Sequence, residues 1–248
     1  ILGLLKPSSG SINLFGVDPW NNAAALHRRM AYVPGDVSLW PNLTGGEAID
    51  LLGNLRDGFS EERRAELIER FALDPTKKSR TYSKGNRQKV AIIAALCADV
   101  ELLILDEPTS GLDPLMERVF QEEILKEKAK GKTILLSSHI MSEVEALADR
   151  VSIISEGTIL QTGTLQDMQK KTKTHVTAHL KNATDGIKKI KGVHNLTIED
   201  RVLSCSVDTN HLEELLKKLL DVGVVNLAIE PPSLEELFLQ LYERQDEP

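Results

Sequence analysis

A short apolar run that ends in two adjacent acids constrains this chain more than any other feature. Residues 102–105 are all aliphatic and lead into Asp106 and Glu107, after which a polar turn follows. The run is too short for a helix and does not alternate, so we expect a parallel strand that is covered on both faces. Ligands bind beyond the carboxyl ends of such strands, which places both carboxylates where a ligand would lie.

Two neighbouring carboxylates at that position can divide the work of phosphate chemistry. Asp106 can hold Mg²⁺ directly or through water, and Glu107 can orient or deprotonate a water that attacks a γ-phosphate. The alternative is a solvated acidic turn that only ends a core strand. The motifs that surround this turn favour the first interpretation.

The same stretch resembles two motifs of ABC-type ATPases. Residues 102–107 resemble the Walker B strand of that family, and residues 110–113, Ser-Gly-Leu-Asp, resemble its D-loop. The resemblance implies that Asp106 binds Mg²⁺ and ATP and that Glu107 is the catalytic carboxylate. It also implies that Asp113 lies along the seam of a dimer and takes part in ATP binding there.

A second strand-like run ends in a histidine. Residues 133–138 read as another buried strand, and His139 follows them. This region resembles the switch region of the same family, one predicted helix and one predicted strand after Walker B. The resemblance implies that His139 contacts the γ-phosphate. An imidazole suits that contact because it can donate to a phosphate oxygen and changes charge near neutral pH. The alternative is a histidine with a purely structural role.

The segment 82–89 precedes an apolar helix and resembles the ABC signature sequence, usually Leu-Ser-Gly-Gly-Gln. Ser83 and Gly85 match that pattern, whereas Lys84 replaces the first glycine and Asn86 is only a similar amide in place of the glutamine. The resemblance implies that the serine, glycine and amide bind ATP held by a partner protomer. A helix amino terminus of this kind suits an anionic phosphate, and a simple helix cap is the alternative. The charge at position 84 either attracts phosphate or is solvated.

The chain contains no Gly-x-x-x-x-Gly-Lys-Ser/Thr loop, which is the phosphate cradle of this family. The Gly-Lys-Thr tripeptide at 131–133 is not one, because position 126 is Lys and the tripeptide leads into a predicted strand. Residues 1–12 resemble the tail of the family's first helix, which the P-loop normally precedes. We therefore expect an amino-terminally truncated sequence that by itself binds and hydrolyses ATP negligibly.

Residues 30–36 lie where the Q-loop strand and turn of the family belong. Gly35 occupies the usual glutamine position, and glycine has no side-chain oxygen for Mg²⁺ or the attacking water. That contact is then lost, supplied by a neighbour such as Asp36, or mediated by water. An ordinary turn explains the Pro-Gly-Asp sequence equally well, so Gly35 is assigned no catalytic role.

Composition limits the remaining classes of protein. The chain has 248 residues, is 41% hydrophobic and carries a net charge of -7, which is enough length for a core of one to two domains. The acidic balance and the absence of a basic block argue against a nucleic-acid partner. No apolar run approaches the roughly 18 to 20 residues that cross a bilayer. Cys97 and Cys205 are expected to be packing thiols in a reducing compartment.

The predicted fold class is α/β, a P-loop NTPase-type ABC ATPase core with a mixed sheet and a helical subdomain, followed by a small α+β accessory domain. We expect the core over residues 1–172, with the helical subdomain at about 42–99, and the accessory domain over 173–248. The expected elements are strands and turns over 13–41, helices at 43–55, 61–73, 90–98, 117–130, 142–148, 185–190 and 211–220, a hairpin at 151–154 and 158–160, and strands at 176–180, 193–198, 203–207 and 224–229.

Residues 231–238 resemble the carboxyl-terminal signature of ABC ATPase subunits that serve drug and related exporters, although a capped final helix explains them locally. The resemblance implies the ATP-binding and ATP-hydrolysing subunit of an ABC transporter, with ATP and Mg²⁺ as cofactors. It also implies a peripheral place on the cytoplasmic face of the cell membrane, a transmembrane permease partner, and a homodimer or a paired second ATPase subunit. The alternatives are a soluble ABC ATPase acting on ribosomes or DNA, and a non-catalytic truncated module.

Overall fold

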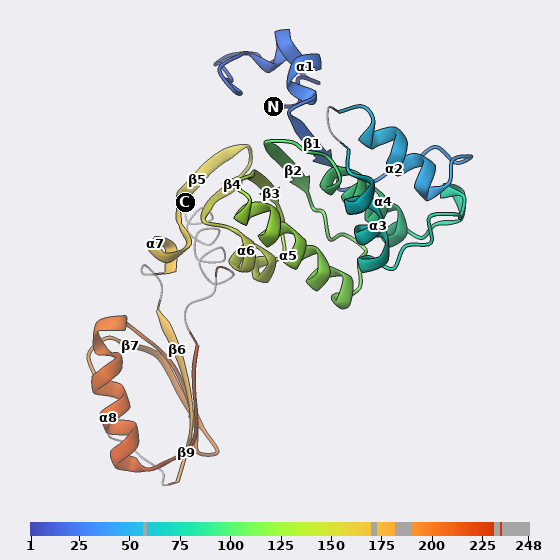
Figure 1. Cartoon of the computed structure of the whole chain (residues 1–248). Helices are drawn as coiled ribbons and strands as arrows, with labels where there is room; N and C mark the ends of the chain where they lie inside the picture. The colour runs from blue at the N-terminus through green and yellow to red at the C-terminus, as the bar shows by residue number, and fades with distance from the viewer. Residues whose placement is uncertain (57–58, 170–172, 182–189, 231–233, 235–248) are drawn as a thin grey trace. The chain divides into compact units, whose positions relative to one another are not determined.

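The computed structural model describes residues 1–56, 59–169, 173–181, 190–230 and 234 (Figure 1). Internal contacts divide the chain into two compact units, residues 1–147 and residues 148–248. The domain boundary expected near residue 172 stays a prediction.

A parallel sheet forms the centre of the first unit. Its strands β1 (Met30–Val33), β2 (Leu102–Asp106) and β3 (Thr133–Ser137) pair in the order β1-β2-β3. The first four residues of β2 are buried and Asp106 is exposed at its carboxyl end. The prediction of a buried parallel strand that delivers an acid to solvent is therefore confirmed.

The prediction that residues 133–138 form a buried strand is only half right. The segment is a strand, but Thr133, Leu135 and Ser137 are exposed and alternate with partly buried residues. The physical reason is position, since β3 pairs with β2 on one side and has no second partner among the described strands. An aliphatic run alone does not distinguish a central strand from an outer one.

Helices pack around this sheet in the first unit, and the core lies between α4, the strands and α5. The helices are α1 (Pro19–His27), α2 (Gly45–Gly53), α3 (Glu61–Arg70), α4 (Lys84–Leu96), α5 (Pro114–Ala129) and α6 (Met141–Leu147). Figure 1 shows α5 and α6 side by side along the sheet. The five helices predicted between residues 43 and 148 are confirmed, with ends that shift by a few residues.

The prediction of strands and turns alone over residues 13–41 is wrong, because it misses α1. The Asp18 carboxylate accepts a hydrogen bond from the Trp20 backbone nitrogen at 2.9 Å, and Pro19 occupies the first helical position. That pair is a strong helix-start signal. Residues 1–12 contain no helix either, although a helix tail was predicted there. Gly3 adopts a φ of +69° and Pro7 has no backbone N–H to donate, so a regular helix is broken at both.

A buried cluster of charges joins α3 to α5. The Glu123 side chain is fully buried and pairs with Arg63, with Arg70 Nε at 2.7 Å and with Lys126 Nζ at 2.8 Å. The two arginines come from α3 and are themselves only 15% and 30% exposed. The cluster therefore connects the helical subdomain to the helix that follows the acidic turn.

We expect Glu123→Ala to lower the free energy of unfolding by about 3–5 kcal/mol, because both arginines would stay largely buried without their common partner. Urea unfolding of the purified chain measures this change. Glu122→Ala is the matched control, since Glu122 pairs with Arg70 while 47% exposed, and it should cost only about 0–1 kcal/mol. Equal stability of the two variants would contradict the expectation.

The second unit contains a hairpin and a separate four-stranded sheet. The hairpin of β4 (Arg150–Ser155) and β5 (Thr158–Thr164) leads into α7 (Leu165–Gln169), and it confirms the predicted hairpin. The antiparallel sheet has the order β7-β8-β6-β9. Its elements are β6 (Thr174–Leu180), β7 (Val193–Glu199), β8 (Val202–Val207), α8 (Leu212–Val222) and β9 (Val224–Glu230), which confirm four predicted strands and one predicted helix.

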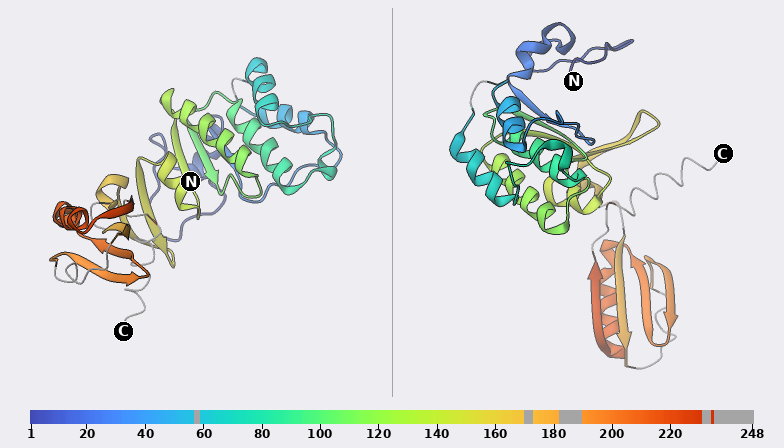
Figure 2. Two further views of the ribbon diagram at one scale, coloured as in Figure 1. Left: turned by 90° about the horizontal axis from the view of Figure 1, so that it is seen from below. Right: turned by 90° about the vertical axis from the view of Figure 1, so that its right-hand side faces the viewer.

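Helix α8 covers one face of this sheet, as Figure 2 shows. Leu215 and Leu219 of α8 are fully buried in one cluster with Val176, Leu203 and Cys205 from the strands. Residues 185–189 of the helix predicted at 185–190, and most of the segment 231–238, lie outside the described residues.

Both cysteines are buried free thiols, as predicted. Burial raises the pKa of the Cys97 thiol to about 12 and that of Cys205 to about 11. Both groups therefore stay protonated and pack as small apolar side chains. Among the described helices, none has both the length and the apolar character needed to cross a membrane.

Candidate functional site

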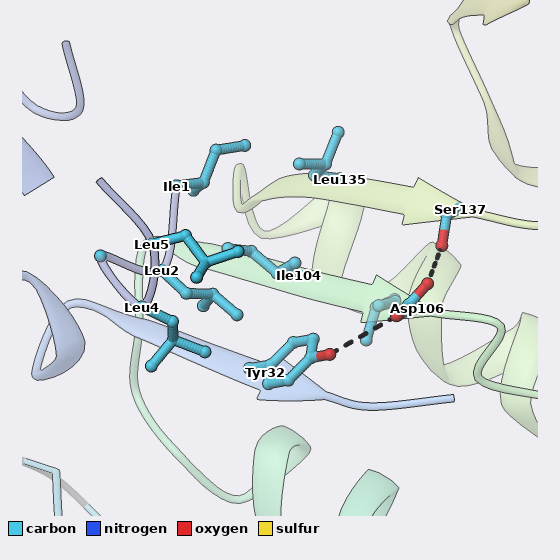
Figure 3. Close-up of a pocket in the computed structure, with 11 residues that line it drawn as sticks. Ile1, Leu2, Leu4, Leu5, Tyr32, Ile104, Asp106, Leu135 and Ser137 are labelled. Carbon is cyan, nitrogen blue, oxygen red and sulfur yellow. Dashed lines mark hydrogen bonds between the residues drawn. The ribbon is translucent and has the colours of Figure 1, made fainter. Parts of the chain in front are cut away.

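Asp106 stands at the carboxyl edge of the sheet with both carboxylate oxygens engaged (Figure 3). The Ser137 hydroxyl donates to Asp106 Oδ1 at 2.5 Å, and the Tyr32 hydroxyl donates to Oδ2 at 3.5 Å. Burial and the nearby Asp106 charge raise the pKa of Tyr32, so its hydroxyl keeps its proton. The carboxylate is thus oriented by groups from both neighbouring strands.

Glu107 follows in a backbone conformation that non-glycine residues rarely adopt. Its φ is +42°, and its backbone nitrogen donates to the Ser137 carbonyl oxygen at 3.0 Å. The sharp turn brings Glu107 Oε1 to 3.3 Å from His139 Nδ1. Side chains of residues that the sequence separates by 32 positions therefore meet, and both remain largely exposed. Backbone strain of this kind concentrates at functional sites.

The turn at residues 34–36 lies directly beside the acidic turn. A Cβ added to Gly35 would lie 3.3 Å from the Asp106 carbonyl oxygen and 3.6 Å from Glu107 Cβ. The buried amide of Gln88 on α4 donates to the Pro34 carbonyl oxygen at 3.2 Å and fixes this turn. The glycine therefore permits a close approach and contributes no side-chain ligand.

The signature-like segment begins α4, and its serine is a helix cap. Ser83 Oγ accepts a hydrogen bond from the Asn86 backbone nitrogen at 3.3 Å, so the local interpretation as a cap is correct. A phosphate contact of Ser83, Gly85 or Asn86 stays a prediction. Lys84 is exposed, and its Nζ donates to Ser110 Oγ at 2.7 Å.

The backbones of the signature-like segment and the D-loop-like segment touch. A Cβ on Gly85 would collide with the carbonyl oxygen of Gly111, which itself has a φ of +83°. Asp113, at the end of the D-loop-like segment, caps α5 by accepting from Leu115 N and Met116 N at 3.1 Å each. The signature-like and D-loop-like segments of the same chain thus lie in contact with each other. Asp106, Glu107 and His139 lie together at the sheet edge.

A pocket of about 400 Å³ lies between residues 1–5 and the sheet, with Asp106 and Ser137 at one end (Figure 3). Its walls are mostly aliphatic, with Leu2 and Leu5 facing Ile104. The described residues that line it include no lysine or arginine. The lining therefore offers no cationic side chain to a phosphate.

The oxygen donors at the sheet edge fit Mg²⁺. Asp106 supplies an exposed carboxylate, and Mg²⁺ is commonly held by one or two carboxylates together with water and substrate phosphates. Within the part of the chain that the structure describes, no group of three or more His, Cys, Asp or Glu side chains could hold a metal ion by itself. A metal bound here would need further ligands from water or from a phosphate compound.

Comparison with known proteins gives matches to ABC transporter ATP-binding proteins in both the amino-terminal and the carboxyl-terminal part of the chain. The family model described as "ABC transporter" matches residues 1–110, and the model described as "ATP-binding protein DrrA1-3-like, C-terminal domain" matches residues 163–242. The linearmycin resistance ATP-binding protein LnrL of Bacillus subtilis is 30% identical over 97% of this chain and 83% of its own length. The chain therefore belongs to the family of ABC transporter ATP-binding proteins.

Solved structures agree with this assignment. A structure described as the ATP binding subunit of an ABC transporter is 33% identical, with a TM-score of 0.63 over 69% of this chain and 73% of that chain. The dimeric structure of MJ0796, a bacterial ABC transporter cassette, is 23% identical with a TM-score of 0.58, and it supports the fold alone. The predicted α/β fold of the ABC ATPase type is confirmed, and nucleotide binding is a property of this family.

Sequence reasoning missed the residues that support the site. Ser137 and Tyr32 contact Asp106, and Gln88 holds the neighbouring turn. Ser137 was within reach of prediction, because parallel pairing places the end of one strand beside the end of the next. The other two depend on side-chain directions that a sequence pattern does not contain.

Gly85→Ala should displace the signature-like segment, because the added carbon would meet a backbone oxygen that cannot rotate away. We expect a loss of about 1–3 kcal/mol in the free energy of unfolding, measured by urea titration. Gly163→Ala is the matched control, since its added carbon would meet Met168 only at an ordinary 3.8 Å. The expectation fails if both alanines leave the unfolding midpoint unchanged.

Proposed function

We propose that this chain is part of the ATP-binding and ATP-hydrolysing subunit of an ABC transporter that powers a separate membrane permease, in the direction of export. The observation that carries the proposal is the 3.3 Å approach of Glu107 Oε1 to His139 Nδ1 beside Asp106. Membership of the family supports ATP as the nucleotide, and the linearmycin resistance relative supports export.

Each residue at the sheet edge has a distinct part in the proposed reaction. Glu107 orients the attacking water and accepts its proton. His139 Nδ1, at 3.3 Å, can donate a hydrogen bond to this carboxylate and so hold it in place. His139 donates a hydrogen bond to an oxygen of the γ-phosphate and compensates developing charge. Asp106 holds Mg²⁺, with its oxygens already directed by Ser137 and Tyr32. Bound Mg²⁺ would neutralise charge on the phosphates.

The signature-like and D-loop-like residues take their part in a dimer. In the proposed head-to-tail arrangement Ser83, Gly85 and Asn86 of one protomer face the ATP of the other, and Asp113 lies along the seam. The partner is a second copy of this protein or a paired ATPase subunit. The exposed positions of Ser83 and Asp113 suit such an interface. Association with the permease would place the subunit on the cytoplasmic face of the membrane.

The proposed domain organisation follows the predicted one. Residues 1–172 form the nucleotide-binding domain, with the helical subdomain at about 42–99, and residues 173–248 form the accessory domain. The separate four-stranded sheet, whose first strand starts at Thr174, supports the proposed limit of the accessory domain.

In the complete protein, Glu107→Gln should leave ATP binding intact and reduce hydrolysis by at least about 100-fold, because the amide cannot accept the proton of water. Phosphate release measures turnover, and a fluorescent ATP analogue measures binding. Glu101→Gln, at the opposite end of β2, is the control and should retain full turnover. Unchanged hydrolysis in the Glu107 variant would remove this residue from the catalytic role.

Residues 1–248 alone should bind and hydrolyse ATP negligibly, because this sequence contains no P-loop. The loss of a single preorganised oxyanion donor costs about 100- to 1,000-fold in rate, and a P-loop supplies several donors and a lysine. Isothermal titration with Mg-ATP tests the binding, with circular dichroism to establish that the chain is folded. Tight binding by the folded chain would refute this expectation.

A further inference from the structure

Glu143 is an acid that the proposed mechanism leaves unexplained. It lies in the first turn of α6, four residues after His139, and its backbone nitrogen donates to the Ile140 carbonyl oxygen at 3.1 Å. The residue is 2% exposed. Neither carboxyl oxygen finds a hydrogen-bond partner with acceptable geometry within the described part of the chain. A buried carboxyl group in that state lowers stability.

Two segments of the candidate site surround this carboxyl group. Thr109, which is 4% exposed, comes from the turn two residues after Glu107, and Ser138 immediately precedes His139. Burial raises the pKa of Glu143, and the charge of Glu117 on α5 adds to that rise, whereas the Ser138 and Thr109 hydroxyls and His139 oppose it. The carboxyl group thus lies where the turn after β2 and the loop after β3 come together.

The contact between Glu107 and His139 needs buried residues that hold the two loops in place. Both side chains are largely exposed, at 48% and 73%, so their mutual contact is too weak to hold two loops in place. Ser138 Oγ is already used as an acceptor by the Ile140 backbone nitrogen at 3.0 Å, which leaves its hydroxyl proton free to be donated. Glu143 is the acceptor to which both Ser138 and Thr109 can donate.

An apolar side chain would be less costly at this position if packing were its sole requirement. Replacing buried polar groups by apolar groups of similar shape is often neutral or stabilising. A buried carboxyl group whose oxygens lack hydrogen-bond partners lowers the stability of the fold. A functional constraint explains its presence better than a structural one.

We propose that Glu143 is a positioning residue for ATP hydrolysis: its buried carboxyl group is placed to accept hydrogen bonds from the hydroxyls of Thr109 and Ser138 and, when it does so, fixes the distance between Glu107 and His139. This inference rests on the proposed function, because it assigns Glu143 to the same reaction. Glu143 itself touches neither water nor phosphate in this scheme. Its effect reaches the reaction through the two loops that carry the reacting side chains.

Glu143→Leu in the complete protein tests the inference, since leucine fills the space without an acceptor. We expect kcat for ATP hydrolysis to fall by about 10- to 100-fold, the range that small misplacements of reacting groups produce. The KM for ATP should change by less than about two-fold, and the melting temperature should stay the same or rise. Glu143→Gln retains an acceptor oxygen and should restore most of kcat. Ala146→Leu, at an exposed position of the same helix, is the matched control and should behave as wild type.

Three outcomes would overturn the inference. The first is a kcat for Glu143→Leu within about two-fold of wild type, and the second is a Leu variant that is strongly destabilised or unfolded, which indicates a structural role. The third is a Gln variant as slow as the Leu variant. If the wild-type complete protein shows no ATP hydrolysis, the proposed function itself fails, and this result is distinct from all three because it appears before any variant is compared.

Discussion

The parallel pairing of β2 with β3 is the constraint on which the candidate site depends. It places Asp106 in register with Ser137, so the acids that follow β2 and the histidine that follows β3 emerge at one edge of the sheet. Successive strand residues point to opposite faces, and a register shift of one position would turn Asp106 away from Ser137 and Tyr32. The fully buried residues of β2 hold this register, because any shift would change their packing against α4 and α5.

The candidate site lowers the stability of the fold, and the rest of the first unit compensates for this loss. Glu107 occupies a strained φ and Glu143 is buried without satisfied oxygens. Around them, the apolar core of α4 and β2 supplies hydrophobic stability, and the buried Glu123 cluster ties α3 to α5. The same chain therefore combines a rigid support with an exposed, strained reactive edge, an arrangement that favours preorganised chemistry.

Predictions from the sequence were correct where contiguous residues determine both the local structure and the place of the functional side chains. The run 102–107 carries its own burial pattern and its own acids, so both the strand and the place of Asp106 followed directly. The predictions failed where a local signal was overlooked or where neighbours decide the outcome. Asp18 and Pro19 form a helix-start signal for α1, but the prediction from the sequence did not include this helix. Leu135 has the character of a core residue but lies 45% exposed on β3, because burial depends on the number of neighbouring strands.

The sequence by itself determined the family, the α/β class and the residues that carry the proposed chemistry, because these depend on motifs whose members are close along the chain. Only the tertiary structure decided which of those residues meet. Two contacts join segments that are distant in sequence: that of Glu107 with His139, and the hydrogen bond from Lys84 to Ser110. The carboxyl group of Glu143 is buried because its helix turns that side chain inward. Such contacts are set by strand register and helix packing, which no single segment encodes.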